Sequence, residues 1–296
     1  MRRVVGLTLL LALVVAAAAT VGRTSPPEAT AARAATCNGA VDTLNLVNAG
    51  RLTIGTDNPA YPPWFAGTPA KGSKWKIGDP TSGKGFESAV AYAVAQWLGF
   101  GRADVQWIYT PFNKAFAPGN KAFDFDINQI SYTPARAKVV TFSAPYYRVN
   151  QSLVVVKGTK IASVRSVKGL RSYKLGAQLG TTSYQYIVNR IKPSQKPAVF
   201  PKNDAAVQAL KNKQIDGLVV DLPTAFYVTA VQVPKGRILG QFPSTAGGEY
   251  FGMVFQKGNS LAGCVNKALA ALQRNGQLAR IQQQWLAKAT GAPVLR

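Results

Sequence analysis

Histidine is absent from this chain of 296 residues, and cysteine occurs only twice. Without histidine the chain lacks the commonest general base, the commonest zinc ligand and every Ser-His-Asp or Cys-His catalytic arrangement. The motifs GxxxxGK[ST] and CxxC are also missing, as is GxGxxG after a predicted strand. The sequence therefore predicts a protein that is not an enzyme and that holds no metal and no cofactor.

Acidic residues are scarce as well, with 12 Asp and Glu against 35 Lys and Arg, a net charge of +23. The basic residues are scattered and form no run typical of a nucleic-acid arm, so no nucleic-acid partner is expected. In an exported protein, such a charge favours electrostatic contact with an anionic membrane or with wall polymers. A solvated basic surface without any partner is the alternative.

A long apolar run occurs only at the N-terminus, where two arginines precede an almost unbroken apolar stretch over 4–19. This run is short for a membrane span and small residues follow it, which is typical of an export signal. Small residues at 17–19 and at 32–34 offer two cleavage positions. We assign 1–35 to a signal peptide followed by a disordered connector.

Two cysteines in an exported chain indicate a disulfide between Cys37 and Cys264, with two unpaired buried thiols as the alternative. Cys37 lies far from the apolar run, so we expect no lipid anchor. Removal of residues 1–34 leaves 31 basic and 11 acidic residues, a net charge of +20. The mature protein is thus predicted to be periplasmic or associated with the cell surface.

Segments of strand and helix character alternate through the mature chain. Strand-like segments lie at 51–56, 105–110, 123–130, 151–157 and 250–255, and helical spacing of apolar residues begins at Phe86 and ends at Gly99. This alternation predicts α/β units with mainly parallel sheets. About 260 residues exceed what one such core needs, so we expect two lobes.

The stretch "INQISYTPARAKVVTFSAPYY" (127–147) places two hydroxyls and an arginine directly after a strand-like segment. Thr133 before Pro134 is a good helix start, so a polar turn that caps a helix is one interpretation. A site for a small carboxylate, with Arg136 as the cation, is the other.

Several segments in the same order resemble the family-3 extracellular solute-binding proteins, which are polar amino-acid receptors of ABC importers. The resemblance runs from about Arg51 to Leu286 and is carried by "LTIGTDNPAYPPW", "GKGFESAVAYAVAQWLGF", "ISYTPARAKVVTFSAPYY", "LGAQLGTTSYQYI", "IDGLVVDLPTAFY" and "NGQLARIQQQWL". It implies an α/β, two-lobed periplasmic-binding-protein type II fold with two strand hinges and a ligand cleft between the lobes. Lobe 1 would comprise 36–148 and 248–296, and lobe 2 would comprise 149–247.

The resemblance also implies roles for five residues around a free L-amino acid. Arg136 would pair bidentately with the α-carboxylate, a geometry suited to the planar guanidinium. Ser131 would contribute at the same place, and Thr181 would add donors at a helix start. Asp221 would bind the α-ammonium, together with the backbone carbonyl of Gln129. Taken singly, Asp221 could be a helix cap and Thr181 an ordinary turn residue.

The residues expected near the ligand's side chain are Asp57, Tyr61, Trp64, Glu87, Phe112 and Gln178. Two carboxylates beside aromatic rings favour a polar or basic side chain, although Glu87 could instead only stabilise the start of its helix. The loop over 66–84 is long for the family, and Trp75 in it could belong to a lid.

The resemblance implies a monomeric receptor that delivers its amino acid to an ABC permease. One alternative is a dehydratase of prephenate or arogenate on the same fold, with Glu87 as an acid. Another is a basic surface protein that holds wall polymers or lipids.

Overall fold

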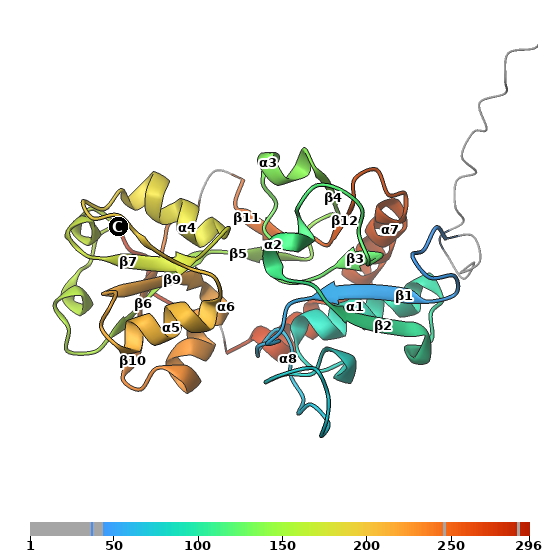
Figure 1. Ribbon diagram of the computed structural model, residues 1–296, viewed down its shortest axis with the longest axis horizontal. Helices are drawn as coiled ribbons and strands as arrows, with labels where there is room; N and C mark the ends of the chain where they lie inside the picture. The colour runs from blue at the N-terminus through green and yellow to red at the C-terminus, as the bar shows by residue number, and fades with distance from the viewer. Residues whose placement is uncertain (1–36, 38–43, 245–246, 289–290) are drawn as a thin grey trace, which may run out of the picture. The chain divides into compact units, whose positions relative to one another are not determined.

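The computed structural model describes residues 37, 44–244, 247–288 and 291–296, all within the unit formed by 35–296 (Figure 1). The export signal and connector predicted for 1–35 lie outside the described residues. None of the helices among the described residues is long and apolar enough to cross a membrane.

Short strands and helices alternate along the described chain. The strands are β1 (Leu52–Thr56), β2 (Val105–Tyr109), β3 (Phe125–Asp126), β4 (Val140–Phe142), β5 (Tyr147–Val149), β6 (Gln151–Val156), β7 (Leu175–Gln178), β8 (Ala198–Phe200), β9 (Gly217–Asp221), β10 (Gly236–Gln241), β11 (Glu249–Phe251) and β12 (Val254–Gln256). The α-helices are α1 (Phe86–Leu98), α2 (Phe112–Ala115), α3 (Pro134–Ala137), α4 (Thr182–Tyr186), α5 (Asn203–Lys211), α6 (Leu222–Tyr227), α7 (Leu261–Arg274) and α8 (Gln277–Leu286). Short 3-10 and π turns are η2 (Pro80–Ser82), η3 (Arg102–Asp104), η4 (Lys160–Ser163), η5 (Lys168–Ser172), η6 (Ile187–Ile191) and η7 (Val228–Gln232).

The strands form two five-stranded mixed sheets, with the orders β2-β1-β3-β12-β4 and β10-β6-β9-β7-β8. The prediction of mainly parallel sheets is wrong, because each sheet has two parallel and two antiparallel strand pairs. The chain returns from the second sheet to the first as β12, which pairs antiparallel with β3 and β4. In the second sheet, β6 pairs antiparallel with both β9 and β10. Strand periodicity shows that a segment is extended but not the direction of its neighbour.

The chain passes between the two sheets along β5 and β11, which pair antiparallel from Glu249–Val149 to Phe251–Tyr147 (Figure 1). The single strand expected over 250–255 is in fact two, because Gly252 and Met253 separate β11 from β12. The last residues depart from the expected division. Leu295 packs in the core of the second sheet, and its amide donates to Gln241 O (2.9 Å), so 291–296 do not belong with lobe 1.

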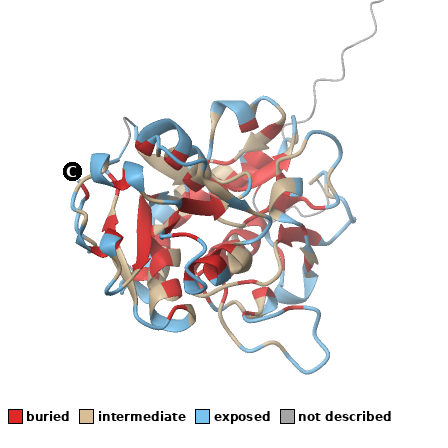
Figure 2. Cartoon of the chain, turned by 60° about the vertical axis from the view of Figure 1, so that its left-hand side comes forward, coloured by how far each residue is buried: buried red, intermediate tan, exposed pale blue. Residues whose placement is uncertain are grey.

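Helices cover the sheets with their apolar faces. α1, α7 and α8 pack together against the first sheet, while α5 and α6 cover one face of the second sheet and the α4–η6 segment covers the other. Gly99 and Gly276 follow α1 and α7 with φ angles of 99° and 73°, the left-handed conformation that ends a helix at low cost. The end of α1 at Gly99 is the one that the sequence predicts. Buried residues lie mainly along the strands and on the inner helix faces (Figure 2).

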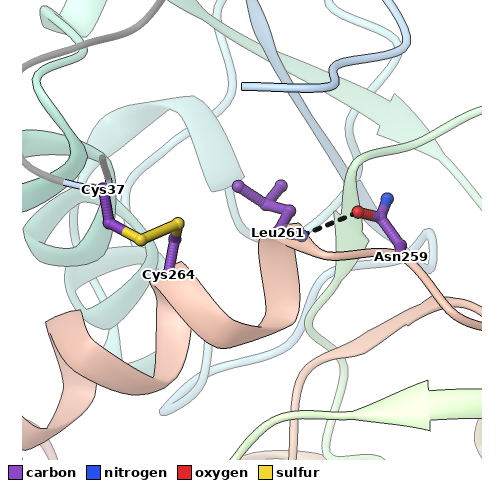
Figure 3. Close-up of a disulfide and its surroundings, with 4 residues drawn as sticks. All are labelled: Cys37, Asn259, Leu261 and Cys264. Carbon is purple, nitrogen blue, oxygen red and sulfur yellow. Dashed lines mark hydrogen bonds between the residues drawn. A yellow bond between two sulfur atoms is a disulfide. The ribbon is translucent and has the colours of Figure 1, made fainter. Parts of the chain in front are cut away.

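The predicted disulfide is confirmed, because Cys37 and Cys264 are bonded with an S–S distance of 2.05 Å (Figure 3). Cys264 lies on α7, close to the start of the helix, where Asn259 Oδ1 accepts a hydrogen bond from the Leu261 amide (2.9 Å). Both cysteines are buried in the core that α1, α7 and α8 share. The bond therefore ties Cys37, which precedes β1 in the chain, to the C-terminal helix α7.

Candidate functional site

A polar cavity of about 100 Å³ lies where loops from both sheets meet. A cavity of that size is room for several waters or a small polar ligand. Its lining residues are Asp57, Pro59, Tyr61, Phe112, Asn128, Gln129, Ser131, Arg136, Gln178, Thr181, Thr182, Ser183, Lys202, Asn203, Val219, Val220, Asp221 and Thr224.

The lining residues follow the carboxyl ends of strands, which is where open α/β sheets usually bind ligands. Asp57 comes directly after β1, and Gln129 follows β3. From the second sheet, Gln178 ends β7 and Asp221 ends β9. Parallel neighbours end at the same edge of a sheet, so residues far apart in the sequence converge there.

Nine of the residues expected at the site line this cavity: Asp57, Tyr61, Phe112, Gln129, Ser131, Arg136, Gln178, Thr181 and Asp221. Trp64 and Glu87 do not. The Trp64 ring packs edge-on against Phe86, Tyr147 and Phe251, and its Nε1 donates to Thr224 Oγ1 (3.0 Å). Trp64 therefore supports the wall from behind instead of facing a ligand.

None of the residues of the loop over 66–84 lines the cavity. Trp75 is buried in the core of the first sheet. The loop is held to the segment after β1, since Asn58 Nδ2 donates to Lys74 O (2.7 Å) and Gly78 N donates to Ala60 O (2.8 Å). Through Trp75 the loop therefore adds to the first core.

Arg136 is the cation at one end of the cavity, and only 7% of its surface is exposed. Its guanidinium donates to Ser131 O (2.5 Å) and Gly180 O (2.7 Å), and it lies over the Phe116 ring at 4.1 Å. Burial lowers the Arg136 pKa to about 10, while Glu249 and Asp221 act in the opposite direction. The side chain remains charged at neutral pH, so the cavity presents a desolvated positive group.

Hydroxyl groups lie beside this guanidinium, from both sheets. Ser131 Oγ and Thr182 Oγ1 are 3.3 Å apart. Thr181 lines the cavity, and its side chain caps α4, because its Oγ1 accepts from Tyr184 N (3.2 Å) and donates to Gln178 O (2.7 Å). The hydroxyl of the "GTTS" turn that lies beside Ser131 thus belongs to Thr182, and the motif alone could not distinguish the two.

Asp221 is a half-buried carboxyl that lines the same cavity. Its Oδ1 accepts from Gln151 Nε2 (2.6 Å), and Gln151 Oε1 accepts from Ser183 Oγ (2.6 Å). Burial, followed by repulsion from Glu249, raises the Asp221 pKa well above its usual value. A ligand ammonium at this carboxyl would favour its charged form and lower that pKa.

A second acidic residue and a lysine occupy the far wall. Asp57 Oδ1 accepts from Asn58 N (2.7 Å), and burial raises the Asp57 pKa, partly offset by the charge of Lys202. Lys202 Nζ donates to Asn58 O (3.0 Å), which joins the turn before α5 to the segment after β1. Lys202 lies in a turn before α5 without any recognisable motif, and the sequence analysis missed it.

Glu87 lies directly behind the cavity and is fully buried. Its carboxylate accepts from Gln129 N (2.6 Å), Gln129 Nε2 (2.5 Å) and the Tyr146 hydroxyl. Gln129 has a φ of 47°, an uncommon conformation for a residue with a side chain. The two contacts with Glu87 hold Gln129 in this conformation, so Glu87 positions a lining residue and does not itself reach the cavity.

We expect Glu87→Gln to flatten the pH dependence of stability between pH 4.5 and 7. Burial raises the Glu87 pKa from 4.5 to about 7, against the opposing hydrogen bonds from Tyr146 and Gln129. The folded protein therefore binds this proton more tightly than the unfolded chain does. Its contribution is fully present below pH 4.5 and is lost as the pH rises through 7, a change on the order of 3 kcal/mol.

Urea unfolding at several pH values measures this change. Asp126 and Asp221 also have raised pKa values, and repulsion from the Glu87 carboxylate contributes to both shifts. The difference between wild type and variant therefore reports Glu87 together with its effect on these two carboxyls. Parallel pH profiles for the two proteins would contradict the assignment.

The chain matches known proteins over most of its length. The family model for bacterial extracellular solute-binding proteins, family 3, matches residues 52–288. The arginine-binding extracellular protein ArtP of Bacillus subtilis (strain 168) is 25% identical over 205 residues, which is 68% of this chain and 77% of that protein.

Two solved structures are similar in fold as well as in sequence. An ancestral arginine-binding protein bound to arginine is 30% identical, with a TM-score of 0.65 over 80% of this chain and 98% of that chain. The ancestral amino acid-binding protein AncCDT-1, a precursor of cyclohexadienyl dehydratase, is 27% identical, with a TM-score of 0.63 over 80% of this chain and 95% of that chain. The two-lobed α/β fold inferred from the sequence is thereby confirmed.

Proposed function

Because the chain belongs to the bacterial extracellular solute-binding proteins of family 3, we propose that it captures a free L-amino acid and delivers it to an ABC permease. One observation carries the proposal: Arg136 and Asp221, which have opposite charges, line the same small cavity together with hydroxyl groups. This arrangement complements a zwitterion, whose carboxylate and ammonium lie a few ångströms apart. The arginine-binding relatives support an amino acid as the ligand.

In this proposal the α-carboxylate binds at Arg136, Ser131 and Thr182, and the α-ammonium binds at Asp221 with the Gln129 carbonyl. The ligand's side chain then lies toward Asp57, Tyr61, Phe112, Gln178 and Lys202. A polar or basic side chain suits this wall, because rings lie beside a carboxylate there. Glu87 no longer supports this preference, since it lies outside the cavity, and Lys202 makes the far wall less acidic than the sequence suggested.

Capture by closure requires two lobes that move about a hinge. We assign 36–148 and 248–288 to one lobe, and 149–247 with 291–296 to the other. The clusters of buried residues support this division, since each draws its members from one of the two lobes apart from Val149 at the boundary. β5 and β11 would then be the hinge strands, since they connect the two sheets.

A thermal-shift panel tests the proposal, with the twenty amino acids, ornithine, citrulline, prephenate and arogenate. A ligand at 100 times its dissociation constant stabilises the folded state by about 2.7 kcal/mol, which is a rise in Tm of roughly 5–10 °C for a chain of this size. We expect the rise with arginine, lysine, histidine or glutamine. A rise only with glutamate or aspartate would keep the receptor and contradict the side-chain preference, and no rise with any amino acid would contradict the receptor.

A dehydratase on the same fold is the second candidate, favoured by the similarity to AncCDT-1. Glu87 cannot serve as the acid of such a dehydratase, because this carboxyl lies behind Gln129 and not in the cavity. We therefore propose a binding protein and not an enzyme. Formation of an aromatic product from prephenate or arogenate, followed by its absorbance, would reverse this choice.

The location is proposed as exported, periplasmic or at the cell surface, without a lipid anchor. Retention would rest on the +20 charge of the mature chain against anionic lipids or wall polymers. Such contacts weaken with ionic strength, so salt should release the protein from cells. Release by wall digestion alone, with no effect of salt, would contradict this.

A further inference from the structure

A third carboxylate lies among the donors that the proposed function gives to the ligand. Glu249, the first residue of β11, has an oxygen, Oε1, that accepts from Ser131 Oγ (2.5 Å) and from Thr182 Oγ1 (2.6 Å). Gln151 Nε2 lies 3.1 Å from each of its two oxygens. Glu249 does not line the cavity itself, and no sequence pattern indicated its role.

The donors around Glu249 come from both sheets. Ser131 follows β3 of the first sheet and forms an isolated bridge with Phe251 of β11. Thr182 starts α4 and Gln151 starts β6, both on the side of the second sheet. Glu249 itself lies on a strand that connects the two sheets. One carboxylate therefore joins hydroxyls of both lobes at the hinge.

Each hydroxyl in this group has only one proton to donate. While Ser131 and Thr182 donate to Glu249, they cannot donate to a second carboxylate. Glu249 also lies close to Arg136. Of the charges that raise the pKa of Arg136, that of Glu249 has the largest effect. An incoming α-carboxylate would meet both occupied donors and a like charge, which disfavours binding.

We propose that Glu249 is an internal carboxylate that occupies the ligand-carboxylate donors in the free protein, and that an incoming amino acid must displace it. This inference rests on the proposed function, because it takes Ser131 and Thr182 as donors to the ligand. Glu249 is partly exposed, so its side chain can turn to water when it is displaced. The apparent affinity is reduced by the fraction of molecules in which the donors are occupied.

Glu249→Gln tests the displacement, by calorimetry with the amino acid that gives the largest thermal shift. The neutral amide competes less strongly for the two hydroxyl protons and does not repel the ligand, so we expect the affinity to rise about fivefold. Asp104→Asn is the matched control: it removes the same charge from an exposed position on η3 and should leave the affinity unchanged. An unchanged or lower affinity in Glu249→Gln would overturn the proposal, the latter because Glu249 would then bind the ligand directly.

A second measurement needs no ligand. Glu249→Ala removes the acceptor that joins Ser131 to Thr182, so small-angle X-ray scattering of the free protein should show a larger radius of gyration than wild type. The Asp104→Asn protein should scatter as wild type does. Identical scattering from Glu249→Ala and wild type would overturn the inference. If scattering changes as expected but no amino acid binds to wild type or to Glu249→Gln, the proposed function fails while the occupied donors stand.

Discussion

Replacement of Arg136 by alanine is expected to weaken amino-acid binding about 100-fold or more. Arg136 is the buried cation of the cavity, and loss of one partner from a buried, hydrogen-bonded charge pair costs about 2–5 kcal/mol. The ligand carboxylate would remain desolvated without its counter-ion, which accounts for the size of the effect. Calorimetric titration of the variant with the identified ligand measures the change.

Arg136 also supports the site, since it donates to Ser131 O and Gly180 O. Thermal unfolding of the ligand-free variant must therefore accompany the titration. Arg136→Lys keeps one charge without the planar fork and should lose part of the affinity. Lys138→Ala removes an exposed charge two residues away and should bind as wild type does. Full binding by a folded Arg136→Ala protein would contradict the proposed carboxylate site.

Replacement of both cysteines by serine is expected to lower the free energy of unfolding by up to about 4–5 kcal/mol. The bond closes a sequence separation of 227 residues, and the entropy that a crosslink removes from the unfolded chain grows with the logarithm of the loop length. Cys37 and Cys264 are also both buried, so serine hydroxyls would enter an apolar core. Urea unfolding of Cys37→Ser/Cys264→Ser against wild type measures the loss.

Reduction supplies the control for this prediction. Wild type unfolded in the presence of a thiol reductant should approach the stability of the double variant, while the variant should not respond to the reductant. Neither cysteine lines the cavity, so the affinity for the ligand should be unchanged. Equal stability of the oxidised wild type and the variant would show that the crosslink contributes nothing.

The sequence by itself determined the order of the elements and much of the candidate site. Apolar spacing and the terminal glycine defined α1. The resemblance to the solute-binding proteins implied Arg136 and Asp221 as site residues, and both line the cavity. These features depend on residues close together in the chain, which is why local patterns predicted them.

The tertiary structure alone decided which way the remaining side chains face. The sequence predicts that Glu87 lies near the ligand's side chain, yet its carboxylate accepts a hydrogen bond from Gln129 N, 42 residues away. Glu249 reaches Ser131 across 118 residues, and Lys202 enters the wall from a turn without a motif. Periodicity identifies the buried face of a segment but not its neighbours, since these depend on how the two sheets pair and where the chain returns. Hydrogen bonds between such distant partners are specified only when the lobes assemble.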